Sequence, residues 1–139
     1  MPSVNGPATA LPGNSSYQAG DGNTSEVRTS VMGAPTAYTT TATITAAELA
    51  TGFLSYTGSG HTLTLPTVAL WEAAYPNTAK LNASFDFTVL ATTGDATLAV
   101  GTGWTLVGGG DGVTSATQAT LWRARRTGTG AWSVYRVAG

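Results

Sequence analysis

The side chains that could catalyse a reaction or hold a metal ion are few in this 139-residue chain. His61 is the single histidine and the chain has no cysteine, so thiolate chemistry and zinc sites with the usual ligand sets are excluded. There are seven carboxylates, namely Asp21, Glu26, Glu48, Glu72, Asp86, Asp95 and Asp111. Counting leaves open a Ser/His/Asp triad or a glycosidase pair of carboxylates, but the Gly-x-Ser-x-Gly nucleophile elbow is absent. We therefore predict no catalytic residue, no metal site and no cofactor.

Three of the carboxylates have structural interpretations. Glu48 follows Thr45 by three residues, which is the spacing of a helix capping box. Asp95 and Asp111 fall in turn segments, where aspartate bonds to nearby backbone N–H groups. A calcium site at Asp111 is a weak alternative, because one carboxylate with some carbonyls makes a poor site for a hard cation.

His61 and the glycine-rich runs also favour structural roles. His61 begins an alternating segment beside Gly60, a position typical of a hydrogen-bonded residue at a strand end. The glycines at 101–103 and 108–110 favour turns over a phosphate loop, because neither run contains Gly-Lys-[Ser/Thr] or opens a long helix.

Four of the six basic residues are expected to lie close together. Arg123, Arg125 and Arg126 lie on one predicted strand, and Arg136 lies on its expected partner strand. Charges on a strand edge can simply be solvated and block aggregation between sheets. They can also form an electrostatic contact with an acidic surface of a partner or a neighbouring subunit. Both interpretations stay open.

The chain has four tryptophans, which are Trp71, Trp104, Trp122 and Trp132. Core packing is the expected role of each, because a tryptophan buries a large apolar area. The alternative is an exposed tryptophan platform that binds sugars.

The chain divides by composition into an N-terminal segment, 1–37, and a β-rich remainder, 38–139. The segment holds four of the six prolines and few large apolar residues, so it cannot bury enough apolar surface to offset the entropy of ordering it. We expect an extended N-terminal arm that takes any order it has from a partner.

The remainder predicts an all-β domain, an antiparallel β-sandwich or jelly-roll-like small barrel with one or two short helical turns. One helix is expected after Thr45, and a second after Thr67 with Leu70, Trp71 and Ala74 as its apolar stripe. Because no helix is long enough for a crossover, we expect mainly antiparallel sheets. Strands are predicted at 38–45, 53–56, 61–65, 84–91, 96–100, 104–107, 116–126 and 131–137, with a hairpin turn at 92–95.

Four stretches of this domain carry a resemblance to known proteins, in the order 43–49 (Thr-Ile-Thr-Ala-Ala-Glu-Leu), 63–67 (Leu-Thr-Leu-Pro-Thr), 84–89 (Ser-Phe-Asp-Phe-Thr-Val) and 101–104 (Gly-Thr-Gly-Trp). This pattern resembles the capsid decoration, or cement, proteins of tailed bacteriophages and the small β-domains of related head fibres. The resemblance covers 38–139 and its motifs are turns and strand edges.

The resemblance implies an all-β, often jelly-roll-like domain, usually trimeric, on the outside of a capsid. In several such proteins an extended terminal arm anchors the domain to major capsid protein subunits. Here the expected arm anchors are Val4, Leu11, Val27, Arg28, Val31, Met32 and Tyr38. The alternative is a fibre or tail-tip domain that binds host surface carbohydrate.

The charge and hydropathy patterns limit the partners. Charged residues make up 9% of the chain, against about 25% in ordinary soluble domains, and the formal net charge is −1. Generic phosphate binding needs clustered positive charge, so we expect no nucleic-acid partner. We see no export signal and no apolar run that would cross a membrane, and expect synthesis in a host cytoplasm followed by assembly into a virion.

Overall fold

The computed structural model divides the chain into two compact units, Met1–Gly33 and Ala34–Gly139. It describes residues 16–18, 28–31, 33–108 and 110–139. In the first unit, β1 (Ser16–Gln18) and β2 (Arg28–Ser30) pair antiparallel. The N-terminal segment therefore contains a two-stranded ladder that its composition did not predict. The second unit is called the body below.

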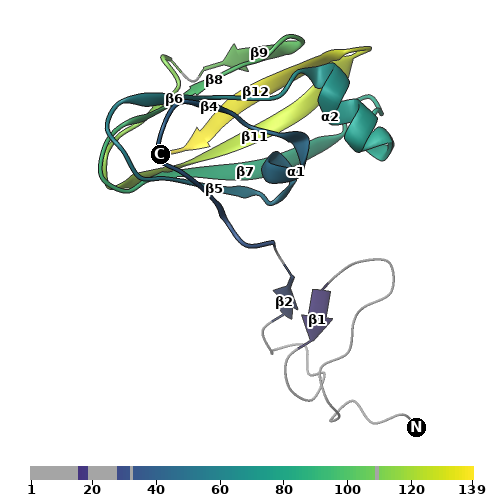
Figure 1. Cartoon of the computed structure of the whole chain (residues 1–139). Helices are drawn as coiled ribbons and strands as arrows, with labels where there is room; N and C mark the ends of the chain where they lie inside the picture. The colour runs from purple at the N-terminus through teal and green to yellow at the C-terminus, as the bar shows by residue number, and fades with distance from the viewer. Residues whose placement is uncertain (1–15, 19–27, 32, 109) are drawn as a thin grey trace, which may run out of the picture. The chain divides into compact units, whose positions relative to one another are not determined.

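The body is built from two β-sheets (Figure 1). The six-stranded sheet has the order β3-β5-β7-β11-β12-β9, with β3 (Thr36–Tyr38), β5 (Phe53–Tyr56), β7 (Ser84–Ala91), β9 (Trp104–Val107), β11 (Gln118–Gly128) and β12 (Ala131–Ala138). The four-stranded sheet has the order β10-β8-β6-β4, with β4 (Ala42–Thr43), β6 (His61–Thr64), β8 (Ala96–Ala99) and β10 (Val113–Thr114). The prediction of an all-β fold is confirmed.

The predicted antiparallel pairing is wrong for most of the body. Among the described body strands, five of the eight neighbouring pairs are parallel, namely β3/β5, β5/β7, β4/β6, β6/β8 and β9/β12. The reason is that consecutive strands from β3 to β8 alternate between the two sheets. When the chain forms a strand of the other sheet between two strands of one sheet, the second of these two strands runs parallel to the first. Parallel neighbours of this kind need no crossover helix.

Two predicted connections are corrected by the same alternation. The segment 38–45 was expected as one strand, but β3 and β4 belong to different sheets. The turn at 92–95 was expected to close a hairpin, but β7 and β8 also belong to different sheets and do not pair. Only the last predicted hairpin, β11 with β12, pairs antiparallel as expected.

Both short helices begin at the predicted caps. In α1 (Ala46–Ala50) the Glu48 N–H donates to Thr45 Oγ1 over 3.2 Å and the Thr45 N–H donates to Glu48 Oε2 over 2.9 Å, which confirms the capping box. In α2 (Val68–Ala74) Thr67 Oγ1 accepts from the Leu70 N–H. A single-turn 3-10 helix (Pro76–Thr78) follows α2.

The expected apolar stripe of α2 is wrong in two of its three members. Leu70 is 60% exposed and Ala74 is exposed, while Val68 and Trp71 are the buried residues of this helix. Val68 and Trp71 are separated by three residues, so they share one face of the helix.

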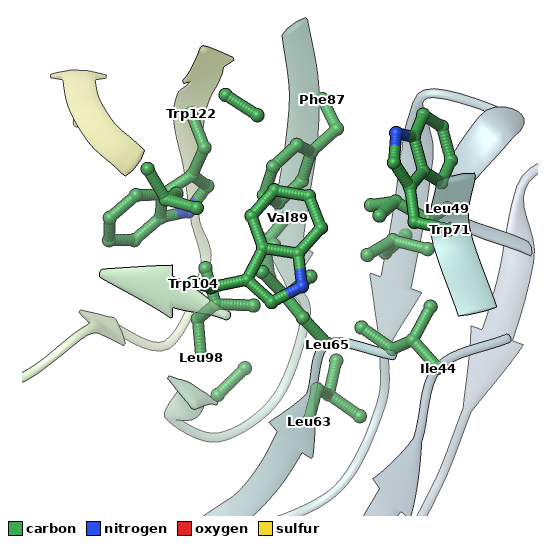
Figure 2. Packing of buried hydrophobic residues seen from close by; sticks show 14 of the residues in the cluster. Ile44, Leu49, Leu63, Leu65, Trp71, Phe87, Val89, Leu98, Trp104 and Trp122 are labelled. Carbon is green, nitrogen blue, oxygen red and sulfur yellow. The ribbon is translucent and has the colours of Figure 1, made fainter. Parts of the chain in front are cut away.

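A single cluster of buried apolar residues draws side chains from both sheets and both helices. Ile44, Leu63 and Leu98 come from the four-stranded sheet and its flanks, and Phe87 and Trp122 come from the six-stranded sheet. Figure 2 shows these side chains together, with Trp104 among them. The body therefore has its own hydrophobic core.

Candidate interaction surfaces

The expected arm anchors fall in three different places. Val4, Leu11, Val27 and Met32 lie outside the described residues. Arg28 begins β2, and Val31, directly after that strand, is 65% exposed. Tyr38 ends β3 and belongs to the body.

Tyr38 is a core residue of the body. Its side chain is 8% exposed, and its hydroxyl donates to Glu48 Oε2 over 2.8 Å. Burial, followed by this hydrogen bond to a carboxylate, raises the pKa of Tyr38 well above its usual value. The backbone N–H of Thr45 lowers the pKa of Glu48, with the Tyr38 hydroxyl as a further cause. Tyr38 therefore ties β3 to the start of α1, and its side chain is not accessible to a partner.

Arg123 makes a two-pronged ion pair across two strands. Its Nε donates to Asp86 Oδ1 over 2.7 Å and its Nη2 donates to Asp86 Oδ2 over 3.0 Å. The two residues are register partners on β11 and β7, and their side chains are 52% and 41% exposed. The hydrogen bond from Arg123 lowers the pKa of Asp86. The charge of Arg123 is therefore balanced by a carboxylate of the body itself.

Arg125 contacts neutral partners. Its Nη1 donates to Asn82 Oδ1 over 2.7 Å, and its Nη2 donates to Tyr135 Oη over 2.9 Å. Its guanidinium carbon also lies 5.8 Å from the centre of the Tyr135 ring. The bond from Arg125 lowers the pKa of Tyr135. Arg125 thus keeps a positive charge that no carboxylate of the described residues balances.

The other two arginines point elsewhere. Arg126 donates from Nε to Glu72 Oε1 over 2.7 Å, and these side chains are only 12% and 19% exposed. Arg136 lies over the Trp122 ring, with its guanidinium carbon 5.7 Å from the ring centre. The four arginines therefore do not form one basic patch. Only Arg123 and Arg125 face the same way as Asp86 on the six-stranded sheet.

All four tryptophans are core residues, as expected. Their exposed fractions are at most 6%, and Trp71, Trp104 and Trp132 gather with Phe85 in one aromatic cluster. Trp104 Nε1 donates to the Pro66 carbonyl over 2.6 Å. The alternative of an exposed tryptophan platform is therefore contradicted.

The polar candidates of the sequence have structural partners. His61 Nδ1 lies 3.3 Å from Thr41 Oγ1, and its ring stands edge-on to Tyr56. Asp95 Oδ1 accepts from the Ala116 N–H over 2.9 Å, and Asp111 Oδ1 accepts from the Val113 N–H over 3.2 Å. Within the described residues, no group of three metal-ligating side chains is found.

Two pockets that the sequence did not predict lie at either side of α2. The larger, of about 770 Å³, is mostly apolar and is bounded by α1, by Leu65 and by the exposed Leu70. The smaller, of about 480 Å³, contains Glu72. Sequence reasoning missed both because each is formed by segments far apart in the chain.

Searches of known proteins find no matching family model, no similar curated protein and no similar solved structure. No helix among the described residues is long and apolar enough to cross a membrane.

Proposed function

We propose that this chain is a non-enzymatic virion structural protein that decorates and stabilises a phage capsid. In this proposal the N-terminal segment binds major capsid protein subunits, and the body sits on the outer surface of the capsid. The observation that supports it best is the division of the chain into a 33-residue N-terminal unit and a body with a complete core. A segment outside a domain core can bind a second protein by adding a strand to an exposed sheet edge of that protein.

The chemistry of the body supports a structural role. Its tryptophans pack in the core, and Glu48, Asp95 and Asp111 hold helix and turn backbones. Asp86 and Glu72 are paired with arginines. Five of the seven carboxylates are thus used in the body's own structure.

The composition of the chain supports dense packing of copies. With 9% charged residues and a net charge of −1, neighbouring copies repel each other weakly. We propose a homotrimer that associates through uncharged faces rich in threonine and alanine. Three arms on one trimer would give avidity, because release of a single arm leaves the other two bound.

The arm is tested by deletion of residues 1–33, which leaves the body with its core. Full-length and truncated protein are added to capsids that lack the decoration, and occupancy is measured by gel densitometry after sedimentation. We expect the truncated protein to lose stable loading. Loading at normal occupancy would contradict an arm-mediated attachment.

A matched pair of point variants separates the arm from the general surface. Val31 in the N-terminal unit and Leu81 in the body are 65% and 66% exposed. Val31→Asp should lower capsid occupancy because it places a charge beside the expected contact, whereas Leu81→Asp should not. Equal effects of the two substitutions would count against a specific contact at Val31.

The alternative location is a fibre or tail tip, with host surface carbohydrate as the target. The body's tryptophans cannot supply its binding platform, because all four are buried. Antibody labelling restricted to the tail end of virions would favour this alternative over capsid decoration.

A further inference from the structure

The smaller pocket lies where three segments of the body meet. These are α2 with its cap Thr67, the loop that precedes β9, and the turn between β11 and β12. Backbone hydrogen bonds join them, because the Val68 N–H donates to the Thr102 carbonyl and the Trp132 N–H donates to the Gly103 carbonyl, both over 2.9 Å. The pocket walls are therefore fixed before any ligand arrives.

Gly103 shows how closely these segments approach. Its φ is +95°, and a Cβ at this position would lie 2.7 Å from Val68 Cβ and 2.8 Å from the Gly130 carbonyl oxygen. Any other residue would push the three segments apart. The pocket has a volume of about 480 Å³, within the range of small-molecule sites.

Glu72 provides a held carboxylate in the pocket wall. Its Oε1 accepts from Arg126 Nε over 2.7 Å and from Trp132 Nε1 over 2.9 Å. These bonds fix the orientation of the carboxylate and lower the pKa of Glu72, with the Arg126 hydrogen bond as the main cause. No donor from the described residues reaches Oε2. Oε2 thus keeps its capacity to accept hydrogen bonds, on a residue that lines the pocket.

Hydroxyl groups complete the lining. Thr102 and Thr129 are exposed, and both border the pocket. Thr67 Oγ1 already accepts from the Leu70 N–H, so its hydroxyl hydrogen is available to donate. The rest of the lining includes the small residues Ala69, Gly103 and Gly130, whose C–H groups form an apolar surface without bulky side chains.

The chemistry of the lining selects the ligand class. Glu72 and Arg126 form an ion pair without net charge, so the lining has no excess charge that would attract an anion or a cation. A ligand that offers several neutral hydroxyl donors and a face of C–H groups matches both the acceptor and the threonines.

We propose that this pocket binds one ring of a neutral saccharide, with Glu72 Oε2 accepting from ring hydroxyls and Thr102 and Thr129 bonding to others. The proposal does not depend on capsid decoration, because a decoration protein and a fibre domain could both use such a site.

The test is an NMR titration of full-length, ¹⁵N-labelled protein. The probes are the methyl glycosides of glucose, galactose, mannose and N-acetylglucosamine, with methylammonium and acetate as charged probes. We expect saturable shifts of the Thr102, Gly103, Thr129 and Gly130 amides with at least one glycoside. Absence of saturable shifts at roughly 50 mM of every glycoside, or shifts with a charged probe alone, would overturn the proposal.

Variants locate the binding. Glu72→Gln should weaken binding about tenfold, because it removes a charged acceptor. Thr129→Val should weaken binding about threefold, because it removes one neutral hydrogen bond. Thr105→Val, an exposed position on β9 outside the pocket, is the matched control and should bind like wild type. If Glu72→Gln and Thr129→Val, both folded by their amide spectra, bind as tightly as wild type, the assignment is wrong.

Discussion

Replacing Glu72 by alanine should destabilise the body strongly, because one carboxylate oxygen serves two donors. Arg126 Nε and Trp132 Nε1 both donate to Oε1, over 2.7 and 2.9 Å. Trp132 is 1% exposed and the Arg126 side chain is 12% exposed, so water can replace little of what is lost.

The magnitude follows from the bonds that are removed. A hydrogen bond to a charged group contributes about 1.5–3 kcal/mol. Arg126 retains a little contact with water, so we take the low end for each bond and expect Glu72→Ala to lower the free energy of unfolding by about 3 kcal/mol. Glu72→Gln keeps an acceptor oxygen but loses the charge, and we expect a loss of about 1 kcal/mol.

The assay is urea unfolding at pH 7, followed by tryptophan fluorescence and by circular dichroism. With a slope of about 1.5 kcal/mol/M, Glu72→Ala should lower the midpoint by about 2 M. The pKa of Glu72 is lowered in the folded state, so its charge stabilises the fold above the unfolded pKa of about 4.3. This contribution is lost as the pH falls through the folded pKa, and the difference between wild type and Glu72→Gln should shrink toward acid pH.

Two results would refute this reasoning. One is a Glu72→Ala protein whose free energy of unfolding stays within about 0.5 kcal/mol of wild type, the range of ordinary surface substitutions. The other is a difference between wild type and Glu72→Gln that grows on acidification.

Three further outcomes are expected in the body. The pKa of Tyr38 is raised in the folded state, so the free energy of unfolding of wild type should fall as the pH rises above about 10. In Tyr38→Phe this fall, measured by urea unfolding at a series of pH values, should be smaller. An equal fall above about pH 10 in the two proteins would contradict the prediction. Gly94→Ala should lower the melting temperature, because its Cβ would lie 2.6 Å from the Ser59 Cα. The control Gly128→Ala places its Cβ where no atom lies within 4 Å, so its melting temperature should fall far less. Equal melting temperatures of the two variants would refute the close approach at Gly94. Arg123→Ala should leave the urea midpoint nearly unchanged, because its ion pair is exposed, and a large drop would show that the pair is more than a surface contact.

Local sequence signals predicted the elements of this fold well. The capping box at Thr45, the cap at Thr67 and the alternation of Phe85, Phe87 and Val89 each define an element that the structure contains. These signals act within a few residues, so the sequence alone reveals them.

The pairing of strands could not be predicted in the same way. A turn such as 92–95 has the composition of a hairpin whether the next strand pairs beside the last or crosses to the other sheet. Here the Gly94 backbone packs against the turn at Gly58 and Ser59, and the chain crosses. Parallel pairing follows from that long-range choice, which depends on how the whole core packs.

The sites were predictable only in part. The burial of the tryptophans follows from their size, and the arginines were located correctly on β11 and β12. Their partners were not, because Glu72 is 54 residues from Arg126 and Asp86 is 37 residues from Arg123 in sequence. Tyr38 was expected to be an anchor of the arm, although its side chain is buried and its hydroxyl bonds to Glu48 in the body.

Immunogold electron microscopy of purified virions tests the central proposal most directly, with an antibody raised against the body. Capsid decoration predicts label spread over the outer surface of the head. Label confined to the tail tip or its fibres, or virions that bind no antibody, would contradict it.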